Sequence, residues 1–316
     1  MKKRTIYFII FLTILGLNHK LISQNKNITI TYKRNPDKSV DLSYTKELPG
    51  SYYLKLKFTT LTNCYPSDFE GVIKGNSGRL IQLKPINREK NVNFSYSYSS
   101  LRGVPNPKVD SLFNYTIPFK KGKKVRIDEA YNVGERHFGS EKPSKWKSYI
   151  IYTNNADTIV CMRKGIIVKI TDKYESDTLY QKSYTSKRNS LIVEHSDGTY
   201  ASYTGFNKNS LFVKLGQTVY PQTQLGIIDK FNNKKYRLSF AVYYLIDNNF
   251  ERNEKQTLKN RKSRNEFLTP YFITENGTSK IEPRKEYTVM FDETILFQEL
   301  TRREKKKYKK NPNIFD

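Results

Sequence analysis

Short alternations of apolar and polar residues recur along most of the chain, and they predict antiparallel β-strands. This period-two pattern is typical of strands that bury one face, and Gly, Asp, Asn or Pro separate most runs from the next. The pattern is clearest over CMRKGIIVKI (161–170), NSLIVEHSDGTYASYTGF (189–206), LFVKLGQTVYPQTQLGIID (211–229) and KYRLSFAVYYL (235–245). Asp197-Gly198 divides the second run and predicts a tight hairpin, in which both turn residues are expected to have φ > 0.

The region 24–125 shows the same short period and predicts a β-sandwich-like domain. Turn clusters rich in Gly, Pro, Asn and Lys divide it into six expected strands, with almost no helical periodicity. The boundary with the next domain is expected near Val125. The six strands cover ITITYKR (28–34), SVDLSYT (39–45), YYLKLKFTTL (52–61), RLIQLKP (79–85), VNFSYSYSS (92–100) and FNYTIPF (113–119).

The rest of the chain extends this all-β, mainly antiparallel fold class. A second β-sheet domain is expected over 126–247, followed by a charged loop and a closing β-hairpin over 248–290. Residues 291–316 predict a short helix from Glu293 to Glu304 and then a basic tail. We expect that tail to be solvated and mobile, because a run of like charges repels itself.

The segment 1–23 has the pattern of a secretory signal peptide: a basic start, an apolar run from Thr5 to Leu17 and a small residue at Ser23. An uncleaved membrane anchor is the alternative, but the apolar run is shorter than the roughly 20 residues that a spanning helix needs. The mature chain is therefore expected to be extracytoplasmic (periplasmic, on the cell surface or secreted) and to have no transmembrane span.

Charge and cysteine content narrow the range of partners. The formal net charge of +26 favours anionic partners such as cell-wall polymers, lipopolysaccharide or a membrane surface. A coding bias toward Lys would give the same excess without any partner. No nucleic-acid motif is present, and the export signal argues against genomic nucleic acid. Cys64 and Cys161 are the only cysteines, and they leave open either one disulfide or two buried free thiols.

Four blocks of the second domain carry a resemblance: RKGIIV (163–168), LIVEHSDGTYASYTGF (191–206), VKLGQTVYPQTQLGII (213–228) and RLSFAV (237–242). In order, spacing and Gly positions they resemble the β-sheet core of the lysostaphin-type (LytM-like) zinc endopeptidases, which cut peptidoglycan cross-bridges. The resemblance covers most of the mature chain and is closest over 157–242. It implies that 126–247 is a LytM-like domain, in which two antiparallel sheets flank a groove that holds the peptide in active relatives.

Enzymes of this family hold one Zn²⁺ with a His, an Asp and a second His, and a water takes the fourth position. Two further His residues assist the reaction. The resemblance places the Asp ligand on Ile150 or Ile151, neither of which can bind a metal. It places the first His ligand on Trp146 by strict spacing, or on His137 if a loop is inserted.

The remaining three His positions fall on Gly205, Arg237 and Ser239. An Arg would put positive charge beside the metal, and a Ser hydroxyl is a poor substitute for imidazole. After the signal peptide is removed only His137 and His195 remain, too few for four His roles. The resemblance therefore implies a degenerate member of the family, a pseudoenzyme with no zinc cofactor, no metal ligands and no catalytic residues.

A degenerate LytM-like domain predicts a groove that binds peptidoglycan peptides or a cell-envelope protein without cleaving them. Two other hypotheses stay open: an active cell-wall metalloendopeptidase with atypical ligands, and a basic structural or adhesive surface protein that binds anionic polymers. The residues expected to contact the ligand are those at the degenerate-site positions, His137, Tyr203, Gly205, Arg237 and Ser239.

Overall fold

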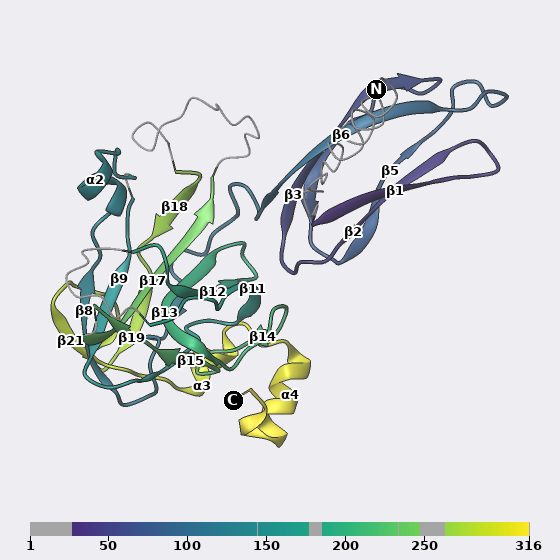
Figure 1. Ribbon diagram of the computed structural model, residues 1–316. Helices are drawn as coiled ribbons and strands as arrows, with labels where there is room; N and C mark the ends of the chain where they lie inside the picture. The colour runs from purple at the N-terminus through teal and green to yellow at the C-terminus, as the bar shows by residue number, and fades with distance from the viewer. Residues whose placement is uncertain (1–26, 144, 177–184, 233, 247–262, 316) are drawn as a thin grey trace, which may run out of the picture.

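The computed structural model describes residues 27–143, 145–176, 185–232, 234–246 and 263–315. The predicted signal peptide and most of the predicted charged loop lie outside these residues. Strands make up most of the regular structure, and nearly all of the strand pairs are antiparallel, which confirms the predicted all-β fold class (Figure 1). No helix among the described residues has the length and apolar character needed to cross a membrane.

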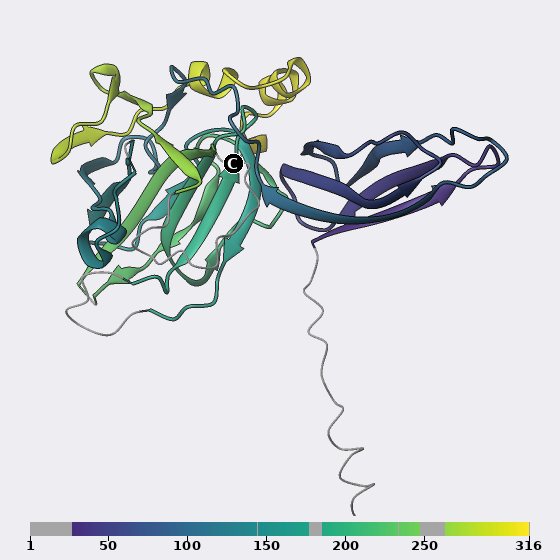
Figure 2. The ribbon, with the colours of Figure 1, turned by 90° about the horizontal axis from the view of Figure 1, so that it is seen from above.

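The first region is a sandwich of two three-stranded antiparallel sheets. Leu residues from both sheets are fully buried between them. The region projects from one side of the larger sheet that follows (Figure 2). Five of its strands were predicted, whereas β4 was not, because its short sequence FEGVI is broken by a Gly. One sheet holds β1 (Ile28–Arg34), β2 (Val40–Lys46) and β5 (Ser77–Leu83), and the other holds β4 (Phe69–Ile73), β3 (Tyr52–Thr62) and β6 (Asn93–Arg102).

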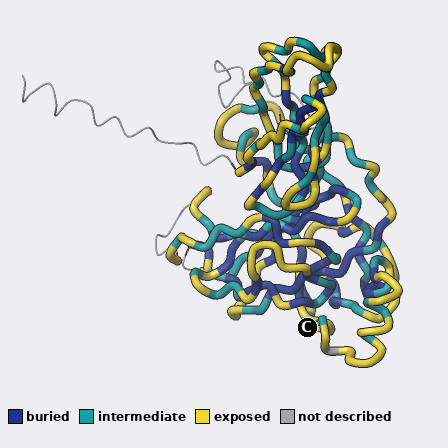
Figure 3. Tube along the Cα trace, turned by 90° about the vertical axis from the view of Figure 1, so that its right-hand side faces the viewer, coloured by how far each residue is buried: buried dark blue, intermediate teal, exposed yellow. Residues whose placement is uncertain are grey.

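The second region is built on one large antiparallel sheet, in the order β14-β11-β12-β13-β17-β9-β8-β21. The main sheet strands are β8 (Lys124–Glu129), β9 (Tyr149–Thr153), β11 (Gly165–Thr171), β12 (Asn189–Glu194), β13 (Tyr200–Leu211), β14 (Thr218–Val219), β17 (Lys235–Leu245) and β21 (Lys285–Thr288). Strands paired at its margins are β10 (Thr158–Val160), β15 (Gln224–Ile228), β16 (Lys230–Phe231) and β18 (Asn265–Leu268). The continuous hydrophobic core of this region packs on one face of the sheet, and Figure 3 shows the buried residues concentrated in the interior of the region.

The predicted hairpin joins β12 to β13. The His195 carbonyl accepts a hydrogen bond from Gly198 N (3.1 Å), and His195 N donates to the Thr199 carbonyl (2.8 Å). Gly198 has φ = 84°, but Asp197 does not have a positive φ. The expectation of two left-handed residues was therefore wrong: the loop is one residue longer, and only its last position needs Gly. The Asp197 carboxylate instead accepts hydrogen bonds from Thr199 N (3.0 Å) and Oγ1 (2.7 Å).

The segment predicted as the sixth strand of the sandwich, 113–119, packs in the second region. Only β7 (Asn114–Tyr115) is a strand, and it pairs in parallel with β19 (Tyr271–Thr274), which also pairs with β20 (Gly277–Lys280). Its apolar side chains belong to the core of the large sheet. Alternation identifies an extended segment but does not say which sheet it joins, so sequence alone placed this one on the wrong side of the boundary.

Buried polar contacts join the two regions. Ser51 N donates to the Glu194 carboxylate, at 2.9 Å from Oε2, and Arg102 Nη1 donates to the Val168 carbonyl (2.6 Å). The Arg102 guanidinium also lies over the Tyr52 ring, 5.0 Å from its centroid. Because the buried groups on each side find partners on the other, the junction is a specific contact.

The end of the chain forms two short helices and a final turn: α3 (Glu293–Phe297), α4 (Arg302–Lys310) and η1 (Pro312–Phe315). The Phe315 ring stacks on Tyr220 at 3.9 Å between centroids, and its carbonyl accepts a hydrogen bond from Thr223 Oγ1 (2.8 Å). The predicted solvated, mobile tail was therefore wrong over these residues. Their aromatic side chains dock the segment, although its Lys residues stay at the surface.

Both cysteines are free thiols, so the disulfide alternative is wrong; Cys161 is buried as the other alternative expected, whereas Cys64 is half-buried. Cys161 is buried, and its Sγ contacts the Arg163 carbonyl at 3.0 Å. Burial raises the pKa of this thiol to about 11, so it stays protonated and is a poor nucleophile.

Candidate functional site

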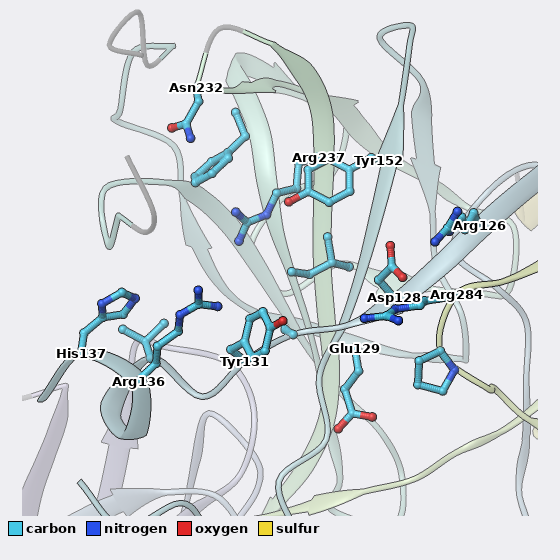
Figure 4. Close-up of a pocket in the computed structure, with 15 residues that line it drawn as sticks. Arg126, Asp128, Glu129, Tyr131, Arg136, His137, Tyr152, Asn232, Arg237 and Arg284 are labelled. Carbon is cyan, nitrogen blue, oxygen red and sulfur yellow. The ribbon is translucent and has the colours of Figure 1, made fainter. Parts of the chain in front are cut away.

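A groove runs over the face of the large sheet that is turned away from the core. Its first part is a cavity of about 930 Å³ above β8, β9 and β17, closed on one side by α2 (Val133–Phe138) (Figure 4). A second cavity of about 730 Å³ continues along the same strands. The two cavities share five lining residues, Arg126, Asp128, Tyr152, Phe231 and Asn232, and together they are called the groove below.

The register of β9 and β17 decides which predicted positions face the groove. Side chains alternate between faces along a strand, so Arg237 and Ser239 lie on the groove face while Leu238 is buried in the core. Ser239 pairs with Ile150 across the sheet. Ile150 lines the groove, whereas Ile151 is 0% exposed in the core. Of the two positions proposed for an Asp ligand, Ile150 is therefore the one on the groove face.

Gly205 on β13 is buried, and its backbone has φ = 122°. A Cβ built there would overlap the Arg237 carbonyl oxygen and Arg188 Nη2. Arg188 Nη2 donates to that same carbonyl at 2.8 Å. The Arg188 guanidinium thus fills the space that any side chain at position 205 would need, so the backbone accepts only Gly.

Phe231 on β16 lies against two guanidinium groups. The Cζ of Arg237 is 4.0 Å from the ring centroid and that of Arg188 is 5.3 Å from it. Arg237 Nε also donates to Ser239 Oγ (3.3 Å). Within the described residues no ion pair joins Arg237 to an Asp or Glu. Burial lowers its pKa, and the nearby Tyr152 hydroxyl opposes that shift.

His137 is exposed on α2 and lines the first cavity. The helix is short, with Asn132 Oδ1 accepting from Glu135 N (2.9 Å) at its start and left-handed Gly139 at its end. Trp146, the alternative position, instead donates from Nε1 to the Ala130 carbonyl (2.9 Å). The structure therefore brings His137 and Arg237 to one cavity, with Ser239 held beneath Arg237.

Tyr203 is not a groove residue, and its prediction was wrong. Its side chain is 0% exposed on the core face of β13, where its hydroxyl accepts from Met162 N (3.0 Å) and contacts Cys161 Sγ. The neighbouring Thr204 pairs with Ser239 and lies on the groove side. Alternation along β13 would place residues 203 and 205 on the same face, so it is the register with β17, in which Tyr203 pairs with the buried Phe240, that puts Tyr203 on the core face.

Most of the groove-lining cations were missed by sequence, because they lie on loops and strand ends that carry no motif. The acidic residues are fewer, and Glu129 is already paired with Lys147 (2.7 Å). The Lys123 ammonium is paired with Asp157 (2.8 Å). The groove therefore has an excess of positive charge. Its cations are Arg126, Arg136, Arg237, Arg284, Lys123, Lys124, Lys234 and Lys235, against Asp128, Glu129 and Glu286.

The residues at the expected zinc positions do not suit a metal. Ile150 has no donor atom, Gly205 has no side chain, and Arg237 puts a cation beside Ser239. Among the described residues, no three His, Cys, Asp or Glu side chains are grouped so that they could hold a metal ion. Zn²⁺ requires a grouped set of thiolate, imidazole or carboxylate ligands, and the described residues at the expected positions do not form one.

Comparison with known proteins found only weak similarity to solved structures. No family model matches the sequence, and no curated protein matches it. A structure from Pseudomonas aeruginosa assigned to peptidase family M23 is similar with a TM-score of 0.27 and 12% identity, over 60% of this chain and 82% of that one. A zinc-containing peptidase from Vibrio cholerae is similar with a TM-score of 0.24 and 12% identity, over 69% and 75%. Similarity at this level says nothing about the chemistry of the groove.

Proposed function

We propose that this chain is an exported, non-catalytic LytM-like protein that binds a peptide of the cell envelope in its groove. The observation that carries the proposal is the state of the expected metal site. Arg188 fills the space beside Gly205, and Arg237 lies where the family pattern has a catalytic His. Two guanidinium groups there disfavour a zinc ion and favour an anionic ligand.

Arg237 is the residue that would bind a carboxylate of the ligand. A partly buried cation without a carboxylate partner is costly, and an incoming carboxylate offsets that cost with charge-assisted hydrogen bonds. The Phe231 ring and Ser239 hold the guanidinium in one orientation, which lowers the entropy lost on binding. Ile150 and the Tyr152 ring add apolar surface beside it, as expected of a site that takes a peptide.

Metal content is the first test. We expect purified protein, exposed to zinc and then dialysed, to retain far less than about one zinc per chain, the ratio that a LytM-type site would hold. It should also leave peptidoglycan uncut with or without added zinc. A stoichiometric zinc ion that survives dialysis, or release of soluble fragments that chelator abolishes, would overturn the proposal.

Ligand binding is the second test. Soluble peptidoglycan peptides titrated calorimetrically should bind the wild-type protein, and Arg237→Gln should weaken binding about tenfold or more, the loss expected for a charge-assisted hydrogen bond. Arg88→Gln, an exposed position on the sandwich, is the matched control and should change nothing. Equal binding by both variants would remove Arg237 from the site.

A further inference from the structure

The geometry points to an acidic protein segment, extended along both cavities, as the ligand of the groove. This inference rests on the proposed function for the groove being a binding site, and it adds the charge and extent of the ligand. A short peptide with one carboxylate would meet Arg237 and leave most of the groove cations without a counter-charge. Complementary charge over the whole length is what distinguishes a specific partner from a poor one.

Two guanidinium groups at the first cavity lie over aromatic rings. Arg237 lies on Phe231, and Arg136 of α2 lies over the exposed Tyr131 ring at 4.3 Å. Figure 4 shows both Arg side chains at the same cavity, reaching in from β17 and from α2. Within the described residues, neither has an ion pair with an Asp or Glu. Stacked guanidinium groups are pre-oriented forks that match the planar carboxylates of Asp and Glu side chains.

The far end of the groove is also cationic. Arg126 and Arg284 line its wall, and Lys124, Lys234 and Lys235 lie beyond them in the second cavity. Arg284 has φ = 68°, a left-handed conformation that costs energy for a residue with a Cβ. Its backbone N donates to the Ile127 carbonyl (2.7 Å), which fixes the residue at the start of β21 and keeps its side chain at the groove.

Apolar surface between these cations favours a polypeptide over a phosphate polymer. Val133, Ile150 and the rings of Tyr131 and Tyr152 line the first cavity. A peptide can cover these surfaces with its own apolar side chains while its Asp and Glu residues meet the Arg and Lys residues. A polyphosphate has only charge to offer and would leave the apolar surface in water.

The experiment measures fluorescence anisotropy of a labelled peptide of alternating Glu and Leu, against the same peptide with Gln at every Glu. We expect the Glu peptide to bind and the Gln peptide to bind about tenfold or more weakly. Arg237→Gln and the double variant Lys234→Gln with Lys235→Gln should each weaken binding of the Glu peptide, because Arg237 lines the first cavity and the two lysines line the second. The matched control removes two Lys charges from the sandwich, with Lys74→Gln and Lys84→Gln, and should have little effect.

Three results would overturn the inference. Binding of the Gln peptide as tight as that of the Glu peptide would show that carboxylates do not matter. An equal loss in the control double variant would assign binding to overall charge. Polyphosphate that binds more tightly than the peptide, with the same dependence on Arg237 and the lysines, would favour an anionic polymer. Arg237-dependent binding of peptidoglycan peptides in any of these cases would leave the proposed function standing, so the two failures are distinguishable.

Discussion

Two arginines on opposite sides of the large sheet are both stacked on aromatic rings, yet their surroundings differ. Arg163 is 2% exposed. Its guanidinium makes two hydrogen bonds to Glu299 (3.0 and 2.9 Å), one to Asp197 (2.9 Å) and one to the Tyr115 hydroxyl (2.9 Å). Arg237 contacts a ring and a Ser hydroxyl, and no carboxylate in the described part of the chain pairs with it. Burial acts to lower the pKa of both, but the acids around Arg163 reverse the shift there and raise its pKa, whereas that of Arg237 stays lowered.

The difference separates a charge that completes the fold from a charge that is available to a ligand. A buried guanidinium needs anions to offset its desolvation, and Arg163 obtains them from the hairpin and from the C-terminal segment. Arg237 lies at a groove that water and ligands reach, so the fold does not have to neutralise it. Substitutions at the two sites should therefore differ in how much they change stability and in whether they change ligand binding.

Arg163→Met should lower the free energy of unfolding by about 3–5 kcal/mol, because it leaves the mostly buried carboxylates of Glu299 and Asp197 without their cation. Urea unfolding followed by circular dichroism measures the loss. Lys164→Met is the matched control. It removes a partly exposed pair with Glu304 (2.8 Å) and should cost less than about 1 kcal/mol. Equal costs for the two variants would mean that the closed cluster is no different from a surface ion pair.

His195 lies beside this cluster and makes it sensitive to acid. Its Nδ1 donates to the Lys164 carbonyl (2.8 Å), and burial, with the charge of Arg163, lowers its pKa to about 4. The His195 imidazole therefore takes up a proton near pH 6.5 in the unfolded chain but only near pH 4 in the folded chain. Stability is complete above pH 6.5 and should fall by about 3 kcal/mol as the pH drops from 6.5 to 4. Urea unfolding across this range should show a flatter pH profile for His195→Gln than for the wild-type protein, and an unchanged profile would contradict the prediction.

Gly205→Ala tests whether the Arg188 guanidinium occupies the space beside position 205. The new Cβ meets a left-handed backbone and the Arg188 guanidinium, and we expect a loss of roughly 2 kcal/mol or more in urea unfolding. Gly277→Ala, at φ = 93° with open space around it, isolates the backbone part of that cost. Adding Arg188→Ala to Gly205→Ala should recover part of the stability. No recovery would mean that Arg188 does not occupy the space.

Arg237→Met should have the smallest effect on folding. Because no carboxylate among the described residues pairs with this cation, we expect the free energy of unfolding to change by less than about 1 kcal/mol in either direction. The same variant should lose the groove ligand in a binding assay. Destabilisation as large as that of Arg163→Met would show that Arg237 is structural and would remove the contrast between the two sites.

Most strands could be predicted from the sequence, because a strand that buries one face alternates apolar and polar residues with a period of two. β1 (Ile28–Arg34) and β17 (Lys235–Leu245) match their predicted ranges at both ends. The same period could not assign residues 113–119 to a sheet, and it could not show that Phe315 would dock a basic tail. Those outcomes depend on contacts between residues far apart in the chain.

The site was predictable only where strand register determines it. Ile150, Arg237 and Ser239 lie on one face because β9 and β17 are paired, and the family resemblance had already assigned all three to positions of one site. Arg188 could not be foreseen, since its place beside Gly205 depends on a loop that carries no motif. Arg136 and Arg284 likewise reach the groove from a short helix and a turn, where charge alone gives no direction.

The Arg163 cluster also has a consequence for the order in which the protein matures. Asp197 follows Arg163 by 34 residues, but Glu299 follows it by 136. At ordinary rates of translation a ribosome needs roughly ten seconds or more to cover the longer interval. The carboxylate that accepts two of the hydrogen bonds from the buried guanidinium is therefore absent until most of the chain has been made, and the Arg163 cluster can be completed only after that.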